Sequence, residues 1–270
     1  MASTFDDERP LPPGIITTGY NEDEEIGLLK SGKEADVFLL RRHGTDGSTC
    51  FLAAKRYRPA DQRAFRNDIT YRAHRRIDGL VRDGTRRRRP KAGRGVQKAM
   101  DQRTDYGKKV LANQWIAAEW EALNTLWTAG APVPYPIARV DDGLVMQFIG
   151  DEEFAAPRLV DARLGREALA GLFEQVRDAM LTFTRAGLVH ADLSPYNTLV
   201  WDEQVWIIDL PQAVPFLSND AATDLLHHDV TTICDWFTRK GLDVDAEDLF
   251  VELVNVAFDY RMRDLFEADG

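Results

Sequence analysis

Three polar residues around one short β-hairpin constrain this chain more than any other feature of its sequence. Asn197 directly precedes a predicted strand at residues 198–201, and Asp209 directly follows its predicted partner strand at residues 205–208. An antiparallel hairpin brings those two ends together, because paired strands lie about 4.8 Å apart. An amide oxygen and a carboxylate held side by side can bind a hard cation such as Mg²⁺ together with phosphate oxygens. Asp192, five residues before Asn197, can face the same point and orient an attacking hydroxyl group.

The spacing of these residues is more informative than any one of them alone. A single Asp or Asn beside a strand is usually a cap or turn residue. An Asp, four residues, an Asn and then an Asp after an apolar strand is the arrangement of the catalytic loop and metal-binding Asp in protein kinases. Leu188, Val189 and His190 lead into this loop, which makes the string more specific. The combination predicts a site for phosphoryl transfer.

A lysine and a glutamate in distant segments predict the rest of this site. Lys55 closes the apolar run at residues 51–54, on the expected third strand of a β-meander, where it can point into a cleft and bind phosphates. Glu119 lies on a predicted helix at residues 112–127 with apolar neighbours three, four and seven positions away, namely Ile116, Leu123 and Leu126. A buried carboxylate needs a cation. We therefore predict a Lys55–Glu119 pair, with Glu121, on a plainer face, as the alternative.

The order of predicted elements indicates two lobes. A β-meander, a helix and a hairpin come first, a connector follows, and the remainder is mostly helical. The predicted strands of the first half are residues 26–29, 37–40, 49–57, 137–140 and 144–149. The predicted helices are residues 59–77, 112–127 and 166–185, with further helix from about residue 219. We expect an α+β, two-lobed, protein-kinase-like fold with an N-terminal extension (1–25), an N-lobe (26–148) and a C-lobe (149–270).

The net charge of −10 argues against a general nucleic-acid binder, but the charge is unevenly distributed. Residues 82–98 hold eight basic residues against one acidic residue, with three glycines and a proline and almost nothing apolar. We expect a flexible loop there. It is either a solvated insertion or a contact surface for RNA or an acidic partner, and the sequence leaves both interpretations open.

Nothing in the sequence indicates a membrane or an oxidising compartment. No apolar run approaches the roughly 18 residues that a membrane span needs, and the polar, acidic N-terminus lacks the apolar region of a signal peptide. Cys50 and Cys234 have no CxxC spacing or metal-ligand context, so we expect reduced thiols. These features favour a cytoplasmic protein without a membrane partner.

Several strings together resemble the RIO family of atypical serine protein kinases, closest to the RIO1 type. The family has an S-x-G-K-E-A-type turn in place of a glycine-rich loop, an L-V-H-A-D-L-S-x-x-N catalytic loop, an I-I-D-x-x-Q metal segment and an F-I-G-x-x-x-x-x-A-P connector. The matching segments here are residues 30–37, 188–197, 207–212 and 148–157, together with Trp115 four residues before Glu119. The resemblance runs from about residue 27 to residue 237, and the catalytic-loop string is highly specific.

The resemblance implies ATP and Mg²⁺ (or Mn²⁺) as cofactors and assigns a catalytic role to each polar residue. Lys55 and Glu119 form the phosphate-gripping pair. Asp192 is the catalytic acid–base or orienting residue. Asn197 and Asp209 hold the metal ion, and Asp209 is the aspartate that some family members transiently phosphorylate during ATPase cycles.

The resemblance also implies how the nucleotide is held. Ser31 and Lys33 lie on the phosphate-covering turn, although a turn with the single glycine Gly32 would otherwise read as an ordinary β-turn. Gln147 and Ile149 offer backbone groups to the adenine, and Met146 lies at the back of the pocket. All of these residues are therefore expected to bind the cofactor.

The activity that the resemblance implies is ATP-dependent phosphorylation of protein serine or threonine, including autophosphorylation. Some family members act as ATPases in the maturation of the small ribosomal subunit, so a ribosomal or RNA-associated partner of residues 82–98 is a further expectation. The family lacks a long activation segment, and no A-P-E string follows Asp209 here. Pro211 departs from the pattern, because the RIO1 type usually has Ser at that position.

Two other classes of function share part of this pattern. Small-molecule phosphotransferases of the aminoglycoside or choline kinase kind share H-x-D-x₄-N, but they usually read H-G-D and I-D-[FW], whereas this chain has Ala191 and Leu210 at those positions. Such an enzyme would be strongly stimulated by one metabolite. A non-enzymatic scaffold would bind nucleotide without turnover, and the complete set of polar groups disfavours it.

Overall fold

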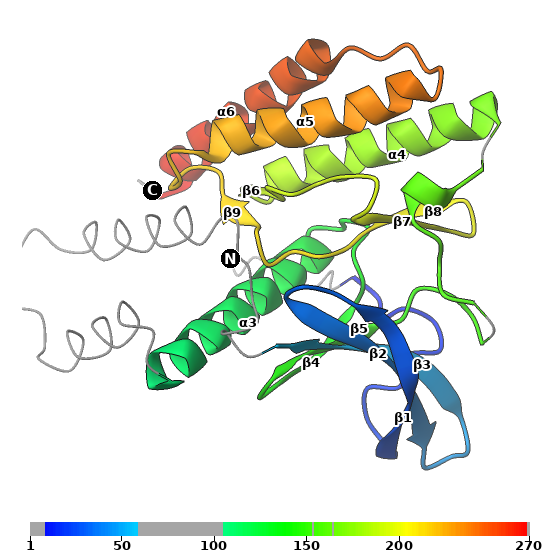
Figure 1. Ribbon diagram of the computed structural model, residues 1–270. Coiled ribbons are helices and arrows are strands. Elements are labelled where there is room, and N and C mark those ends of the chain that lie inside the picture. The colour runs from blue at the N-terminus through cyan, green and yellow to red at the C-terminus, as the bar shows by residue number, and fades with distance from the viewer. Residues whose placement is uncertain (1–8, 59–104, 153, 164, 269–270) are drawn as a thin grey trace, which may run out of the picture.

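The computed structural model describes residues 9–58, 105–152, 154–163 and 165–268 (Figure 1). Within these ranges a β-sheet lobe and a helical lobe lie at opposite ends of the molecule, as the order of elements predicts. The helix predicted at residues 59–77 and the basic segment at residues 82–98 lie outside the described residues, so both stay predictions. Among the described residues, no helix is long and apolar enough to cross a membrane.

Five antiparallel strands form the sheet of the first lobe, in the spatial order β1–β2–β3–β5–β4. Their bounds are β1 (Tyr20–Ser31), β2 (Ala35–Gly44), β3 (Thr49–Tyr57), β4 (Pro136–Val140) and β5 (Gly143–Gln147). The predicted meander and hairpin are confirmed. Strand β3 is central, and Lys55 on it is paired with Val37 of β2 and Leu144 of β5.

Strand β1 begins at Tyr20, six residues before the predicted start at residue 26. Its acidic first half has no apolar alternation, and an exposed edge strand does not need one. The pairing is secured instead by Arg42 of β2, which is 3% exposed and donates to both carboxylate oxygens of Asp23, at 2.6 and 2.7 Å. The predicted boundary between extension and N-lobe therefore falls inside this strand.

The segment that precedes β1 packs on the rest of the protein from residue 9 onward. The Arg9 guanidinium donates to the carbonyl oxygens of Trp127 and Ala131, at 3.2 and 2.8 Å, and lies over the Trp127 ring. Ile15 and Ile16 pack against buried side chains of the sheet. Residues 9–19, which lie within the predicted N-terminal extension (1–25), thus contact the folded part of the protein.

Helices build most of the second lobe. They are α4 (Arg166–Arg185), α5 (Ala222–Arg239) and α6 (Ala246–Ala268), which pack together at the end of the molecule away from the sheet (Figure 1). The short elements between them are η2 (Leu159–Asp161), β6 (Leu188–Val189), β7 (Thr198–Trp201), β8 (Gln204–Ile207) and β9 (Val214–Pro215). Strand β6 pairs with β9, and β7 pairs with β8 in the predicted hairpin.

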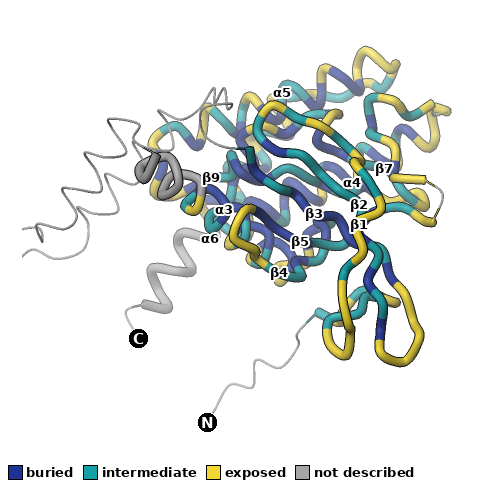
Figure 2. The backbone as a smooth tube through the Cα atoms, turned by 60° about the horizontal axis from the view of Figure 1, so that its bottom comes forward, coloured by how far each residue is buried: buried dark blue, intermediate teal, exposed yellow. Residues whose placement is uncertain are grey.

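Helix α3 (Asp105–Thr128) connects the two hydrophobic cores. Its residue Ile116 packs with buried residues of the sheet lobe, whereas Leu123 and Leu126 belong to the large core of the helical lobe. Figure 2 shows the resulting burial: β3, β5 and the adjoining part of α3 lie inside, and β1 is largely exposed. A side chain at the middle of α3 is therefore held at the junction of the lobes. Cys50 and Cys234 are buried free thiols, as expected.

Candidate active site

Lys55 and Glu119 form a buried ion pair at this junction. Lys55 Nζ lies 2.5 Å from Glu119 Oε1, and the two side chains are only 9% and 4% exposed. The other carboxylate oxygen of Glu119 accepts a short hydrogen bond from the Tyr57 hydroxyl. Glu121 is exposed on the same helix. The pairing predicted from helix periodicity is confirmed, and the alternative partner Glu121 is wrong.

Lys55 has a second anionic neighbour in Asp209, whose Oδ1 lies 2.7 Å from Nζ. Burial alone would lower the pKa of Lys55, but the charges of Asp209 and Glu119 outweigh it and raise that pKa well above its usual value. Burial would likewise raise the pKa of Asp209, but the charge and hydrogen bond of Lys55 bring it down to about 2. Both groups are therefore charged at neutral pH.

The backbone of β3 at Lys55 depends on a glycine in the adjacent strand. A Cβ atom on Gly143 would lie 1.8 Å from the Lys55 carbonyl oxygen and 3.1 Å from the Cα atom of Arg56. Any side chain larger than hydrogen would therefore push β5 and β3 apart. Gly143, the first residue of β5, thus fixes the strand that carries the lysine.

The predicted catalytic residues come together at the β7–β8 hairpin. The Ile208 N–H donates to the Asn197 carbonyl oxygen at 3.0 Å, so the residue before Asp209 lies beside Asn197, as the hairpin argument requires. Asn197 Nδ2 donates to the Asp192 carbonyl oxygen at 2.8 Å and to Asp192 Oδ2 at 3.1 Å. Because the amide nitrogen is engaged in this way, the amide oxygen of Asn197 is the group left to contact a cation.

Asp192 is electrostatically suited to proton transfer. Burial raises its pKa above the usual value, and the nearby charge of Asp209 raises it further, whereas His190 and the hydrogen bond from Asn197 lower it. The net shift is upward. A carboxylate with a raised pKa is a better general base near neutral pH than an ordinary one.

The His190 side chain supports the catalytic loop that carries Asp192. It is 3% exposed and stacks on Phe183, and burial lowers its pKa, so the ring is neutral. Its Nε2 lies 3.1 Å from the Ile208 carbonyl oxygen, which can only accept, so this nitrogen carries the proton. Its Nδ1 then accepts from the Asp192 N–H at 3.3 Å. The ring thus connects the catalytic loop to the end of β8.

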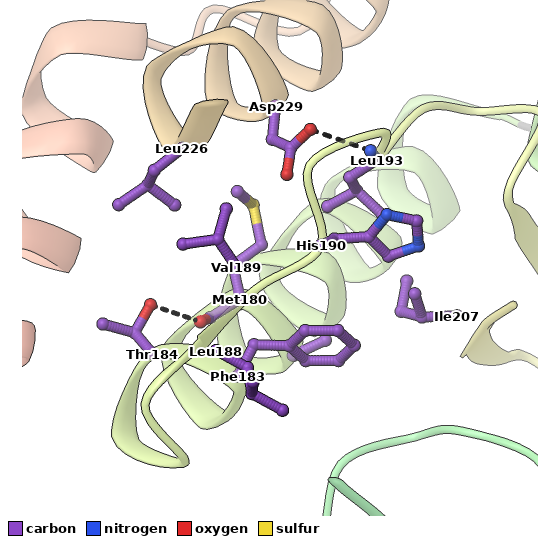
Figure 3. Close-up of a pocket in the computed structure, with 11 residues that line it drawn as sticks. Met180, Phe183, Thr184, Leu188, Val189, His190, Leu193, Ile207, Leu226 and Asp229 are labelled. Carbon is purple, nitrogen blue, oxygen red and sulfur yellow. Dashed lines mark hydrogen bonds between the residues drawn. The ribbon is translucent and has the colours of Figure 1, made fainter. Parts of the chain in front are cut away.

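Asp229 of α5 is a site-supporting residue that the sequence reasoning missed. It is 1% exposed, and its two oxygens accept from the backbone N–H groups of Ala191 and Leu193, each at 2.8 Å. Figure 3 shows the bond to Leu193. Ala191 has φ +65°, a left-handed conformation that is unfavourable for a non-glycine residue and is held here by its bond to Asp229. Burial raises the pKa of Asp229 to about 8, against the opposing effect of the two N–H groups.

The signal for Asp229 was present in the sequence. Leu226 and Ile233 lie three residues before it and four after it, the same acid-in-an-apolar-stripe pattern that identified Glu119. The cavity beside Asp229 in Figure 3 has a volume of only about 10 Å³. It is too small for a ligand, so this region positions the loop and binds nothing itself.

A cleft of about 560 Å³ opens between the lobes, a volume in the range of small-molecule sites. Among the predicted residues, those that line it are Lys33, Lys55, Glu119, Met146, Gln147, Ile149, Asp192 and Asp209. Asn197 is not on the cleft surface but contacts Asp192. Ser31 is not on it either, and its hydroxyl oxygen accepts from the Arg58 guanidinium at 2.6 Å.

The oxygen donors fit a magnesium ion that is bound together with a nucleotide. Among the described residues, no cluster of three or more His, Cys, Asp or Glu side chains could hold a metal ion by itself. Asp209 and Asn197 offer one carboxylate and one amide oxygen. Mg²⁺ is usually held by one or two carboxylates, with waters and substrate phosphates completing its coordination.

The family model and the relatives found by comparison with known proteins belong to the same family. The family model described as the RIO domain matches residues 83–249. The RIO-type serine/threonine-protein kinase Rio1 of Haloferax volcanii is 37% identical over 248 residues, which cover 92% of this chain and 75% of that protein. The serine/threonine-protein kinase rio1 of Dictyostelium discoideum is 36% identical over 139 residues, or 51% of this chain and 24% of that longer protein.

A solved structure supports the fold. The Rio2 kinase–ADP/Mg²⁺–phosphoaspartate complex from Chaetomium thermophilum aligns with a TM-score of 0.56 and 17% sequence identity, covering 90% of this chain and 72% of that one. At this identity the likeness concerns architecture alone. Together with the sheet lobe and the helical lobe described above, it confirms the two-lobed α+β fold of the kinase type.

Proposed function

This chain belongs to the RIO family, and on that premise we propose that it is a serine/threonine-protein kinase that transfers the γ-phosphoryl group of ATP to protein hydroxyls, its own included. The observation that carries this proposal is the convergence of Lys55, Glu119, Asp192 and Asp209 on one cleft. These residues come from four separate segments, and no structural requirement of the sheet or the helices explains why all four are charged and directed to one place.

Lys55 binds phosphate oxygens in this proposal. Its pKa is raised, so the ammonium group is permanent, and Glu119 holds it from the buried side with support from Tyr57. A charge that is positioned before the reaction stabilises the developing charge without reorganisation. Lys55 is thus a binding and electrostatic residue, whereas Glu119 positions it.

Asp192 orients the attacking hydroxyl group and receives its proton. Its raised pKa and the hydrogen bond from Asn197 suit a base that must be ionised, correctly oriented and not too weak. Asp209 and Asn197 would hold Mg²⁺, which neutralises charge on the nucleotide phosphates. Mn²⁺ is a second cation that the same donor set would accept.

The backbone hydrogen bonds of Gln147 and Ile149 limit which of their groups are free to contact the adenine. The Gln147 N–H donates to the Tyr135 carbonyl oxygen at 2.9 Å, and the Ile149 carbonyl oxygen accepts from the Ala156 N–H at 2.9 Å. These two groups are used within the protein. The remaining pair, the Gln147 carbonyl oxygen and the Ile149 N–H, would supply one acceptor and one donor to the adenine edge, with Met146 behind the ring.

A second output of the same site is an ATPase cycle. In it, an Asp209 carboxylate oxygen attacks the γ-phosphorus, ADP leaves, and water later hydrolyses the acyl phosphate to release inorganic phosphate. The solved relative is a phosphoaspartate complex, which motivates this variant of the proposal. A cytoplasmic location and a ribosomal or RNA partner of residues 82–98 also remain proposals.

The decisive experiment is incubation of the full chain with γ-labelled ATP and Mg²⁺, followed by mapping of the label. Acid-stable label on Ser or Thr supports the kinase, and acid-labile label on Asp209 with phosphate release supports the ATPase. Asp192→Asn serves as the control for protein phosphorylation. Neither label nor phosphate release from the wild type, or turnover only after addition of one small metabolite, would overturn the proposal.

A further inference from the structure

Two cations besides Lys55, namely Lys30 and Arg158, face the same cleft. Both are half-buried, and both line the cleft. Neither side chain has a hydrogen bond or an ion pair to another residue in the part of the chain that the structure describes. By contrast, the Arg42, Arg58 and Arg177 side chains all bind carboxylates. Partly burying a cation without a counter-ion is costly, so this pair of side chains needs an explanation.

The backbone of β1 is irregular where Lys30 enters the cleft. The pairing of β1 with β2 shifts register between Leu28 and Lys30. In a regular strand, successive side chains point to opposite faces, yet the consecutive residues Leu29 and Lys30 both line the cleft. Such irregularities re-aim side chains beside active sites. The strand is therefore built to direct Lys30 inward, at the point where it leads into the phosphate-covering turn.

Arg158 is fixed on the opposite side of the cleft, in the connector after Pro157. Its backbone forms a β-bridge with Leu199, and the Pro157 carbonyl oxygen accepts from the Val200 N–H at 3.0 Å. Both contacts are to β7, the strand that leads away from Asn197. The position of Arg158 is thus tied to the hairpin that carries the metal-binding residues.

The charges around Lys30 are those of the phosphate site. Burial lowers its pKa; Asp209 raises it, and Arg158 and Lys55 lower it. Lys30 therefore lies within electrostatic range of the other two cations in the cleft. Glu119 and Asp209 already compensate the charge of Lys55, whereas Lys30 and Arg158 have no ion pair with a carboxylate among the described residues, so an entering anion would gain most from these two cations. The anion must be multivalent or extended, because the cations come from β1, β3 and the connector.

We propose that Lys30 and Arg158 form a two-sided clamp, from the sheet lobe and the helical lobe, which binds the polyphosphate of the nucleotide in addition to Lys55. The inference rests on the proposed function, since that function supplies the anion. It replaces Ser31, whose hydroxyl is engaged by Arg58, with Lys30 as the side chain that the turn directs at the phosphates. Binding of the polyphosphate by both cations would also draw the two lobes together.

The test compares the affinity of the full chain for ATP and for adenosine, with Mg²⁺ present, by calorimetry. Lys30→Met and Arg158→Leu should each weaken ATP binding by about 10-fold or more, the usual size of one lost hydrogen bond to a charged group. Adenosine affinity should stay unchanged. Lys30→Arg should restore most of the ATP affinity, and inorganic triphosphate should lose affinity in parallel with ATP.

Arg56→Gln is the matched control. Arg56 lies next to Lys55 on β3 but is half-exposed and pairs with Glu25 at 2.6 Å, away from the cleft. Arg56→Gln removes one positive charge from the sheet lobe, as Lys30→Met does, and should leave ATP affinity unchanged. An equal loss of ATP affinity in this control variant would mean that net charge alone explains the effects of the Lys30 and Arg158 substitutions.

The outcomes separate this inference from the proposed function. Wild-type protein that fails to bind ATP overturns the function and, with it, the clamp. Wild-type protein that binds ATP, with both variants binding it equally well, overturns the clamp alone, and so does an equal loss of ATP and adenosine affinity. A variant with unchanged ATP affinity but poorer transfer to an acidic acceptor assigns the cations to the acceptor and likewise overturns the proposal.

Discussion

Lys55 Nζ lies 2.7 Å from Asp209 Oδ1, although 154 positions separate the two residues in the sequence. This ion pair joins the central strand of the sheet lobe to the loop after β8 in the other lobe. Its two carboxylate partners differ in access: the Asp209 side chain is 34% exposed, whereas that of Glu119 is 4% exposed. Asp209 can therefore turn to an incoming cation while Glu119 keeps the lysine in place.

The first prediction concerns Lys55 and Glu119 as one unit. Lys55→Met should lower turnover by about 10²-fold or more, because a positioned charge is lost from the site of reaction. Glu119→Gln should lower it by a smaller factor, since the lysine remains but is less well held. The double variant should be less impaired than the product of the two single effects, because groups that act together are non-additive. Steady-state kinetics of the four proteins measure this coupling.

A matched control for this cycle is available on the same helix. Glu121 is exposed and two residues away, so Glu121→Gln should leave turnover unchanged and should combine additively with Lys55→Met. If the effects of the Lys55 and Glu119 substitutions on turnover multiply independently, the two residues do not act together as their 2.5 Å contact predicts.

The second prediction concerns the metal. Asp209→Ala should abolish the part of ATP affinity that depends on Mg²⁺, because it removes the charged ligand of the proposed metal site. The measurement is ATP affinity with Mg²⁺ and with excess chelator, in wild type and variant. In the variant the two values should coincide. A variant that still binds ATP more tightly with Mg²⁺ would show that the ion is held elsewhere.

The third prediction separates binding from chemistry. Asp192→Asn keeps the size and the hydrogen-bonding position of the side chain but removes the base. Turnover should fall by about 10²–10⁴-fold, the usual loss for a positioned acid–base group, while the dissociation constant of ATP changes little. Single-turnover kinetics and equilibrium binding measure the two quantities. Turnover at the wild-type level would remove Asp192 from the mechanism.

Much of the fold and of the candidate site could be predicted because particular residues break a strong local pattern. Glu119 interrupts an apolar helix stripe, and Asn197 and Asp209 bracket a hairpin whose geometry leaves little freedom. Burial of one carboxylate then requires a cation, and Lys55 is the lysine that follows the apolar run of the central strand β3. In each case a local pattern and a simple energetic cost determine a contact across the fold.

The remainder depends on tertiary context that no local pattern records. The acidic first half of β1 is a strand because Arg42 pairs with Asp23, a contact visible only once the strands are aligned. Lys30 enters the cleft because of an irregularity in strand pairing, and alternation alone would have directed it elsewhere. Ser31 occupies the variable position of the family's S-x-G-K-E-A turn, and its hydroxyl group is held by Arg58.

The fourth prediction concerns the close contact of β5 with β3. Gly143→Ala should lower the free energy of unfolding by about 1–3 kcal/mol, as forced overpacking does, because the new Cβ would meet the Lys55 carbonyl oxygen at 1.8 Å. Turnover should fall as well, since the backbone that carries Lys55 must shift. Gly27→Ala is the control, because a Cβ on this glycine of the same sheet meets nothing within 4 Å. Urea unfolding measures the free energy of unfolding of both variants, and steady-state kinetics measure their turnover.

The last prediction is a pH dependence that comes from Asp229. Its pKa in the folded protein is raised to about 8 from an ordinary value of 3.8. Between these values the folded chain binds a proton at Asp229 that the unfolded chain does not, so this residue makes the free energy of unfolding fall as pH rises. Asp229→Asn removes the titration. It should also add a pH-independent loss of stability of about 1–3 kcal/mol, because an amide has one oxygen in place of the two that accept from Ala191 and Leu193.

The deficit of Asp229→Asn relative to wild type should therefore be largest near pH 5 and should shrink as pH approaches 8. Urea unfolding of both proteins at pH 5, 6, 7 and 8 measures it, with Asp235→Asn, an exposed residue of the same helix, as the control. The opposite trend, a deficit that grows with pH, would mean that the two backbone N–H groups outweigh burial and keep Asp229 ionised. Because Asp229 holds the N–H groups on both sides of Asp192, turnover should decline together with stability, and its pH profile should be altered in the variant.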